Sequence, residues 1–286
     1  MLASHSITFW PRPPRNPSCR GFSLVELLVA SGLGLVVMAA VASLFAVFGR
    51  GVSQGQARVE LNSRLRNVCW RMRQDLVGRT AAPQRLAQVD SNSGYLQVMP
   101  GASPTAPDIL ALTTSTPGAD LAGRLDGAKG YESPVAEIAW FCEPDSGNLY
   151  QGQQVYILHR RQLLVAACPD AGAFANNVFA AKGTSDLSWA TGQAMSLGDL
   201  TKSANRFLAT NPVRRLQGQR EGEDIVLRGV LAFDIKLVEP AGPVDGAFDT
   251  TETGAADQIL RGIEVRIRYL DPSNNQPREV RVAHAF

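Results

Sequence analysis

The stretch Gly21-Phe22-Ser23-Leu24-Val25-Glu26-Leu27-Leu28 opens a long apolar run, around which the rest of the chain is organised. From Phe22 to Phe48 the only charged residue is Glu26, and almost every other residue is apolar or small. The run is 27 residues long, whereas a helix needs only about 20 residues to cross the hydrocarbon layer of a bilayer. The sequence therefore predicts a membrane helix at 22–48.

Glu26 is the unusual feature of this helix. An ionisable side chain inside the hydrocarbon layer costs about 2.5–3.5 kcal/mol on insertion scales, so it indicates a functional site that has a partner. The simpler alternative is an ordinary signal anchor, in which Glu26 reaches the membrane interface. The residues around Glu26 favour a more specific interpretation.

The segment GFSLVELL resembles the processing site of the type IV prepilin family. Members of that family have a basic leader ending in Gly, then Phe as the first and Glu as the fifth mature residue. The resemblance implies that a prepilin peptidase cleaves after Gly21 and methylates the amine of Phe22. It also implies an assembly role for Glu26, as the partner of a neighbouring subunit's amine. A carboxylate in lipid needs such a partner, so the physical argument agrees with the resemblance.

Residues 1–21 are accordingly expected to be a leader, and they carry three arginines. Their removal leaves 25 basic and 26 acidic residues, and this balance gives no electrostatic reason to expect nucleic-acid binding. The positive-inside rule places the leader in the cytoplasm and the residues beyond Phe48 outside it. We therefore expect a single-pass protein in the inner membrane, with its C-terminal domain in the periplasm.

The chain has four cysteines, of which Cys19 would leave with the leader. Disulfides persist in the periplasm. We predict a disulfide between Cys142 and Cys168, because both flank an expected hairpin, although spacing alone leaves the connectivity open. Cys69 is expected to be a buried thiol on the helix.

The helical pattern continues from Gly49 to about Arg79 but becomes amphipathic. Five apolar residues recur at spacings of four, three, four and four, namely Leu61, Leu65, Val68, Met72 and Leu76. This stripe predicts packing on a soluble core. Gly78 and Pro83 mark the end of the helix. The predicted organisation is a leader (1–21), a membrane and assembly helix (22–48), its amphipathic continuation (49–80) and a β-rich head domain (81–286).

Beyond Pro83 the sequence predicts short strands between turn-rich loops. Apolar and polar residues alternate at 230–238, 262–270 and 278–284, which is typical of strands with one buried face. Further strands are expected at 95–99, 108–113, 135–142, 155–159 and 163–167, with a loop at 115–132 and a turn at 143–148. The predicted fold class is α+β, with the amphipathic half-helix covering an antiparallel sheet.

This layout resembles a pilin. The segment Arg64–Asp75 and the closing strand pair are similar to PilW-type minor pilins and to the J-type minor pseudopilins of type II secretion. The length of the chain favours a minor subunit over a major pilin.

The sequence contains no recognisable catalytic constellation, and we expect neither an enzyme nor a cofactor. His159 and His284 lack metal-ligand spacing to each other or to cysteine. Four acidic residues in one loop match no defined calcium motif and are expected to be solvated: Asp245, Asp249, Glu252 and Asp257. Arg160-Arg161 and Arg214-Arg215 are expected to be surface charge.

Our hypothesis is a minor pilin that primes or supports the assembly of a type IV pilus and can enter the fibre. Its expected partners are major and minor pilin subunits, the prepilin peptidase and membrane lipid. The alternatives are a minor pseudopilin of type II secretion and a pilus-associated adhesin or DNA-uptake module.

Overall fold

The computed structural model describes residues 22–85, 93–115, 121–125, 129–165, 189–190, 193–194, 196–206, 223–252 and 259–286. The chain forms two compact units, Met1–Gln54 and Gly55–Phe286. Gly21 and the rest of the leader lie outside the described residues, as does Cys168.

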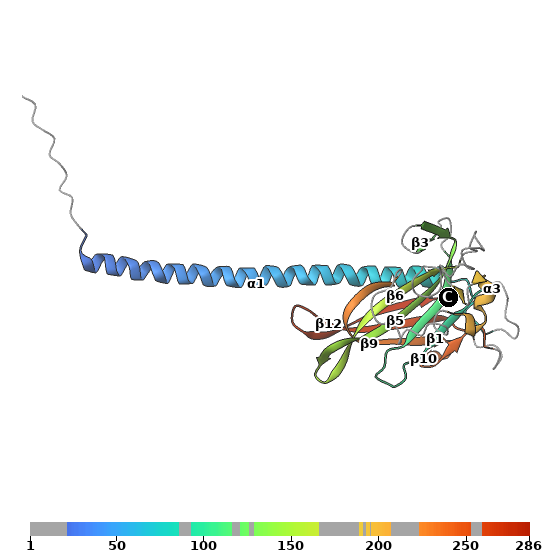
Figure 1. The fold of residues 1–286 in the computed structure, drawn as a ribbon. Coiled ribbons are helices and arrows are strands. Elements are labelled where there is room, and N and C mark those ends of the chain that lie inside the picture. Colours follow the sequence, from blue (N-terminus) through green and yellow to red (C-terminus); the bar gives the residue numbers. More distant parts are fainter. Residues whose placement is uncertain are drawn as a thin grey trace, which may run out of the picture. The chain divides into compact units, whose positions relative to one another are not determined.

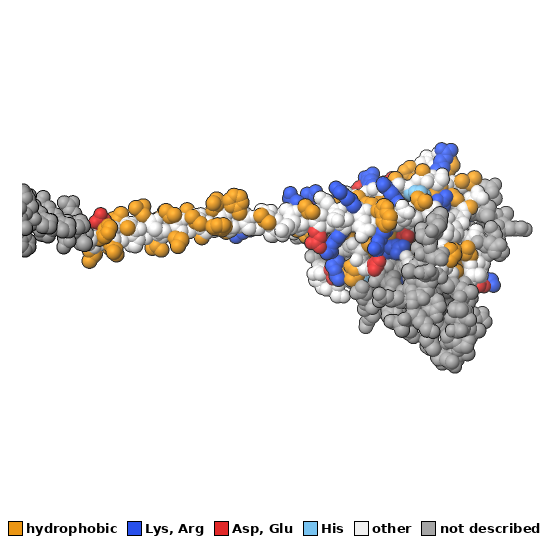
Figure 2. Space-filling model, turned by 90° about the horizontal axis from the view of Figure 1, so that it is seen from above, with side chains coloured by type: hydrophobic (Ala, Val, Ile, Leu, Met, Phe, Trp, Pro, Cys, Tyr) orange, Lys and Arg blue, Asp and Glu red, His pale blue; other side chains and the backbone are white. Residues whose placement is uncertain are grey.

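A single helix, α1 (Leu24–Val77), begins in the first unit and ends in the second. In the first unit its side chains are exposed and mostly hydrophobic (Figure 2). Its length and composition are sufficient to cross a membrane. The hydroxyls of Ser31 and Ser43 donate to the carbonyls of Leu28 and Ala39, at 3.0 and 2.9 Å, so their polar groups are satisfied within the helix. The long apolar helix predicted from the sequence is confirmed.

The second unit is built on a nine-stranded antiparallel sheet (Figure 1). Eight strands follow the order β11-β1-β2-β5-β6-β9-β12-β13, and β10 pairs with β9. The bounds are β1 Leu96–Met99, β2 Ile109–Ser115, β5 Val135–Tyr150, β6 Gln153–Leu164, β9 Glu223–Glu239, β10 Gly242–Val244, β11 Phe248–Asp249, β12 Gly262–Asp271 and β13 Gln276–Ala285. Smaller elements are β3 Leu121–Leu125, β4 Lys129–Ser133, β7 Trp189–Ala190, β8 Gln193–Ala194, α3 Leu197–Leu200 and the 3-10 helix η1 Ser203–Asn205. A long helix followed by an antiparallel sheet is the predicted α+β architecture.

The apolar stripe of α1 packs on the sheet. Leu65, Val68, Met72 and Leu76 are buried, and Leu61 is partly buried against the same cluster. Successive side chains of a strand point to opposite faces, so each strand contributes alternate residues to this cluster. From β5 and β6 they include Ile138, Trp140, Leu158 and Leu164. The prediction that the stripe forms core is confirmed.

The three strands predicted from alternation are present, and they are paired in register. Val265 of β12 lies opposite Ile235 of β9 and Val282 of β13. The predicted hairpin between the last two strands is also present, with its turn after Asp271.

The end of the chain is packed against the end of α1. The backbone N–H of Phe286 donates to the carbonyl of Arg261 at 2.8 Å. The guanidinium of Arg79 lies over the Phe286 ring, 4.1 Å from its centroid. Figure 1 shows the C terminus beside the end of the helix. The final residue is therefore part of the packing of the head.

Three local predictions were wrong. The expected turn at 143–148 lies within β5, where the register shifts between Pro144 and Leu149, and the chain reverses at Gln151-Gly152 with φ of 50° and 82°. Strand β6 runs continuously through Arg160-Arg161, because these residues pair in register with Trp140 and Ala139 of β5. The expected loop at 115–132 contains the β3–β4 hairpin. At these positions residues typical of turns misled the prediction, because strand pairing satisfies the backbone hydrogen bonds there.

Truncating the buried stripe should destabilise the head domain. We expect Met72→Ala to lower the free energy of unfolding by about 2–5 kcal/mol, because it leaves a cavity under the helix. Gln74→Ala, an exposed change on the same helix, should alter it by less than about 0.5 kcal/mol. Denaturant unfolding of the full chain in detergent measures both, and equal effects would contradict the packing described above.

Candidate functional site

Glu26 lies in the first turn of α1, one helical turn after the exposed Phe22. A carboxylate at a helix N-terminus is favoured by the partial positive charge of the backbone N–H groups. A shallow hollow lined by Ser23, Val25, Glu26, Val29, Ala30 and Leu33 surrounds it. Its lining, apart from Glu26 and Ser23, is apolar.

No cation within the described part of the first unit can neutralise Glu26. Arg50 is the next basic residue along the helix, and 24 residues at a rise of about 1.5 Å place it about 36 Å away. Within the described part of the first unit, α1 therefore supplies no cationic partner for this carboxylate.

The end of α1 is held to the sheet by a buried carboxylate. Asp75 is 5% exposed. Arg160 of β6 donates to it twice, with Nη2 2.7 Å from Oδ1 and Nε 2.9 Å from Oδ2. The indole Nε1 of Trp140 donates to Oδ2 at 2.8 Å. A bidentate arginine and an indole N–H leave this buried charge well paired.

A close backbone approach reinforces this contact. The backbone N–H of Ser115 donates to the carbonyl of Gly78 at 2.7 Å. A Cβ on Gly78 would lie 2.3 Å from the carbonyl oxygen of Ser115. Glycine at the end of the helix is therefore required by the approach of β2.

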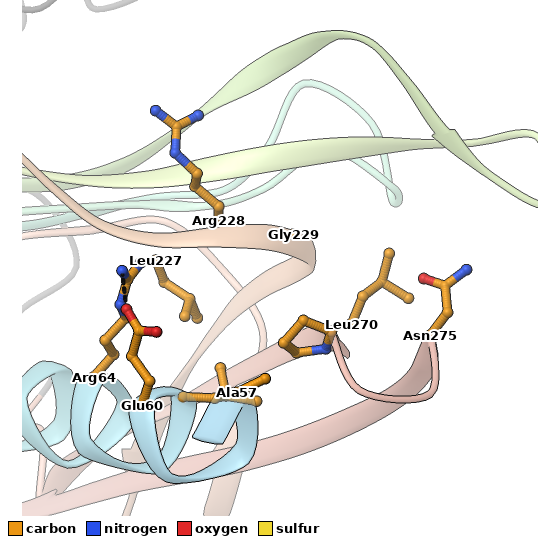
Figure 3. Close-up of a pocket in the computed structure, with 10 residues that line it drawn as sticks. Ala57, Glu60, Arg64, Leu227, Arg228, Gly229, Leu270 and Asn275 are labelled. Atoms are coloured by element: carbon orange, nitrogen blue, oxygen red, sulfur yellow. Dashed lines mark hydrogen bonds and ion pairs between the residues drawn. The ribbon is translucent and has the colours of Figure 1, made fainter. Parts of the chain in front are cut away.

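A groove of about 430 Å³ opens between the first turns of α1 in this unit and strands β9 and β12 (Figure 3). It is lined by Ala57, Glu60, Leu61, Arg64, Leu227, Arg228, Gly229, Leu270, Pro272 and Asn275. Glu60 and Arg64 form an ion pair of 2.6 Å, and Arg228 points away from the groove in Figure 3. The lining has neither a histidine nor a cysteine. It provides a concave, largely apolar surface and no recognisable catalytic group.

The β12–β13 turn is organised by Asp271. Its Oδ1 accepts from the backbone N–H and the hydroxyl of Ser273, at 2.9 and 2.6 Å. Arg278 lies 2.8 Å from its Oδ2. The hydrogen bonds from Ser273, with the nearby arginines, lower the pKa of the Asp271 carboxyl from its ordinary value of 3.8. The Nε of Arg58 donates to the Ser273 hydroxyl at 2.9 Å and links the turn to α1.

The two histidines considered in the sequence lie in separate surroundings. His159 stacks on Phe141, with ring centroids 5.3 Å apart, and lies 3.8 Å from the Glu143 carboxylate. His284 packs edge-on against Phe286. No group of three or more candidate ligands that could hold a metal ion occurs within the described residues.

The three acidic residues of that loop that the structure describes do not form a common site. Asp245 faces Lys236 at 3.7 Å, and Glu252 faces Arg85 at 3.1 Å. Asp249 is buried against Arg206, at 2.5 Å, so the expectation that it is solvated was wrong. Asp257 lies outside the described residues, as do Arg214 and Arg215.

Arg160 and Arg161 are not surface charge. Arg160 binds the buried Asp75, and Arg161 is fully buried on the opposite face of β6. That face also carries a polar network, in which Tyr95 donates to Glu137 at 2.7 Å and the Arg206 guanidinium lies 4.1 Å from the centre of the Tyr95 ring. Sequence reasoning missed this network because its residues come from segments far apart in the sequence.

Cys69 and Cys142 lie partly buried beside the core, and they form no disulfide with each other. Burial raises the pKa of both thiols. Because Cys168 lies outside the described residues, its pairing with Cys142 stays a prediction.

A family model described as the prokaryotic N-terminal methylation motif matches residues 16–42. The matched range contains Gly21, Phe22 and Glu26 and the beginning of α1. This match supports a type IV pilin-like prepilin. No curated protein and no solved structure matches the chain significantly.

Removing only one partner of the Asp75 contact should be more harmful than removing both charges. We expect Arg160→Met to lower the free energy of unfolding by about 3–5 kcal/mol, because it leaves a buried carboxylate with the indole alone. The double variant Asp75→Leu with Arg160→Met should lose less than the single variant. A double-mutant cycle measures the coupling, and additive effects would contradict a buried ion pair.

The Asp271 turn should make stability sensitive to acid. The folded-state pKa is below the unfolded value, so the stabilisation is present above about pH 4 and is lost as the pH falls through the folded pKa. Asp271→Asn should flatten this part of the pH profile of unfolding. Parallel profiles for the two proteins would show that Asp271 is not responsible.

Proposed function

We propose that this chain is a minor pilin of a type IV pilus, of the PilW type, which primes or supports assembly. In this proposal the leader is cleaved after Gly21 and the amine of Phe22 is methylated. The observation that carries the proposal is the methylation motif over 16–42, with Glu26 as the only charge between Phe22 and Phe48.

The chemistry of assembly follows from Glu26. Its carboxylate has no cation within reach on its own helix, and the mature N-terminal amine of a neighbouring subunit is a cation of suitable size. A polar pair in an apolar helix bundle penalises every slipped arrangement, because slippage leaves both charges unpaired in lipid. The Glu26–amine pair would therefore set the axial register between neighbours.

The second unit supports a structural role. Its sheet is covered by α1 on one face, and the groove between α1 and strands β9 and β12 is lined by apolar residues with Glu60 and Arg64, without a histidine or a cysteine. In the proposal this head is periplasmic and the apolar part of α1 is a single pass through the inner membrane. Its partners are other pilin subunits, the prepilin peptidase and membrane lipid.

The mature N-terminus tests the processing step. We expect the protein purified from its own membrane to begin at a methylated Phe22, and to retain residues 1–21 in cells that lack the peptidase. Intact mass and N-terminal sequencing measure both states. Retention of the leader in peptidase-competent cells would contradict the proposal.

Substitution of Glu26 tests the assembly step. We expect Glu26→Ala to abolish piliation while leader cleavage and the folded head are retained, and Glu26→Asp to restore at least part of it. Electron microscopy of piliation, with limited proteolysis of the head as control, gives the result. Normal piliation with loss of adhesion or DNA uptake would instead favour a binding module.

A J-type minor pseudopilin of type II secretion would share the motif and the fold. Deleting the chain distinguishes the two, because loss of pili with normal protein secretion supports the minor pilin. Loss of secretion with normal pili supports the pseudopilin.

A further inference from the structure

Strand β13 ends in a contact that includes a histidine. His284 lies opposite Ile263 of β12, and its imidazole packs edge-on against the Phe286 ring, with centroids 5.4 Å apart. The guanidinium of Arg79 lies over the same ring, 4.1 Å from its centroid. We call this arrangement of His284, Phe286 and Arg79 the Phe286 contact.

The backbone of His284 has little room to move. A Cβ on Gly262, at the start of β12, would lie 2.4 Å from the carbonyl oxygen of His284. The backbone N–H of Phe286 donates to the carbonyl of Arg261 at 2.8 Å. These close approaches hold the imidazole at the Phe286 contact, so a change of charge on the ring is not relieved by a small shift of the strand.

The charged groups that face the imidazole within the described residues are cations. Arg73 on α1 and Arg79 just after α1 both act on His284 electrostatically, and neither forms an ion pair with a described carboxylate. On the side of β12, the residue opposite His284 is the uncharged Ile263, and the side chain of Arg261 is exposed. A proton on His284 would therefore add a third positive charge without a counter-ion.

These surroundings favour a neutral imidazole over an imidazolium. The Nε2 atom of His284 is buried and has no hydrogen-bond partner among the described residues. In the neutral ring Nε2 can be the nitrogen without a proton, and its lone pair is compatible with neighbouring guanidiniums. Protonation places an N–H there, without an acceptor. Burial, followed by the charges of Arg79 and Arg73, accordingly lowers the pKa of His284 from its ordinary value of 6.5.

We propose that the Phe286 contact is an acid-sensitive closure, in which neutral His284 keeps the last residues packed beside Arg79 and protonated His284 releases them. The closed form binds this proton less readily than the open form. Closure is therefore complete above the ordinary pKa of histidine and is lost as the pH falls through the lowered pKa. Release would uncover Arg79 and the Phe286 ring, next to the end of α1. This closure does not require the proposed function.

The experiment uses the full chain in detergent at a series of pH values. Hydrogen exchange of the segment ending at Phe286, divided by the intrinsic exchange rate at each pH, measures opening of the contact. Exchange in β9, which is separated from β13 by β12, is the internal control. NMR of histidine-labelled protein measures the titration of His284.

Three variants are compared with the wild type. His284→Gln cannot be protonated, and Arg73→Gln removes one of the two neighbouring cations from an exposed position. Arg66→Gln is the matched control, because Arg66 is also exposed and lies about 10 Å earlier along the same helix.

We expect the protection of the last residues in the wild type to fall several-fold as the pH decreases from about 7 to about 5, while the protection of β9 stays constant. His284→Gln should remove this dependence. Arg73→Gln should reduce it and raise the titration midpoint of His284, because one repulsive charge is gone. Arg66→Gln should match the wild type.

Constant protection of the last residues of the wild type over this range would overturn the inference, and so would an equal pH dependence in His284→Gln. If His284→Gln does not fold, the arginine variants decide, because equal titration midpoints of His284 in both would also overturn it. Leader cleavage and piliation do not enter these measurements, so the acid-sensitive closure and the proposed function can fail separately.

Discussion

The buried Asp75 carboxylate is the interaction on which the arrangement of the head depends. Hydrophobic packing alone is tolerant, because a helix can shift by one turn and still bury leucines and valines. The buried Asp75 carboxylate does not allow such a shift, because it must stay hydrogen-bonded to both Arg160 and the Trp140 indole. The contact, together with the close approach at Gly78, fixes how far α1 lies along the sheet and which way it is rotated.

Glu26 is a second carboxylate on the same helix, and it too needs a partner when it is out of water. Asp75 is satisfied by its own chain, whereas Glu26 has no cation within reach in the described first unit. Asp75 therefore stabilises the folded head, whereas Glu26 requires a partner. In the proposed function this difference separates folding, which the chain completes alone, from assembly, which it does not.

The sequence predicted those features that depend on local periodicity. The helix, its buried stripe and the strands at 230–238, 262–270 and 278–284 were all recognised, because alternation and helical spacing are visible in a single segment. The Asp75 contact was not recognised, because it joins a helix to two strands 65 and 85 residues away. Arg160-Arg161 resembled surface charge for the same reason. The β5 turn was misplaced because Pro144 and Gly147 lie in an irregular part of a strand rather than at its end. The motif around Glu26 could be recognised because its residues are contiguous.

The packing of the last residue has a practical consequence. Phe286 lies under Arg79 and is hydrogen-bonded to Arg261, so this residue is a structural element of the head. An affinity tag or fluorescent protein fused there would begin inside a packed contact, next to the point where α1 meets the sheet. The Gln151-Gly152 reversal is exposed and lies at a hairpin tip, and such tips tolerate insertions. An epitope for following this chain in the cell is better placed at that turn.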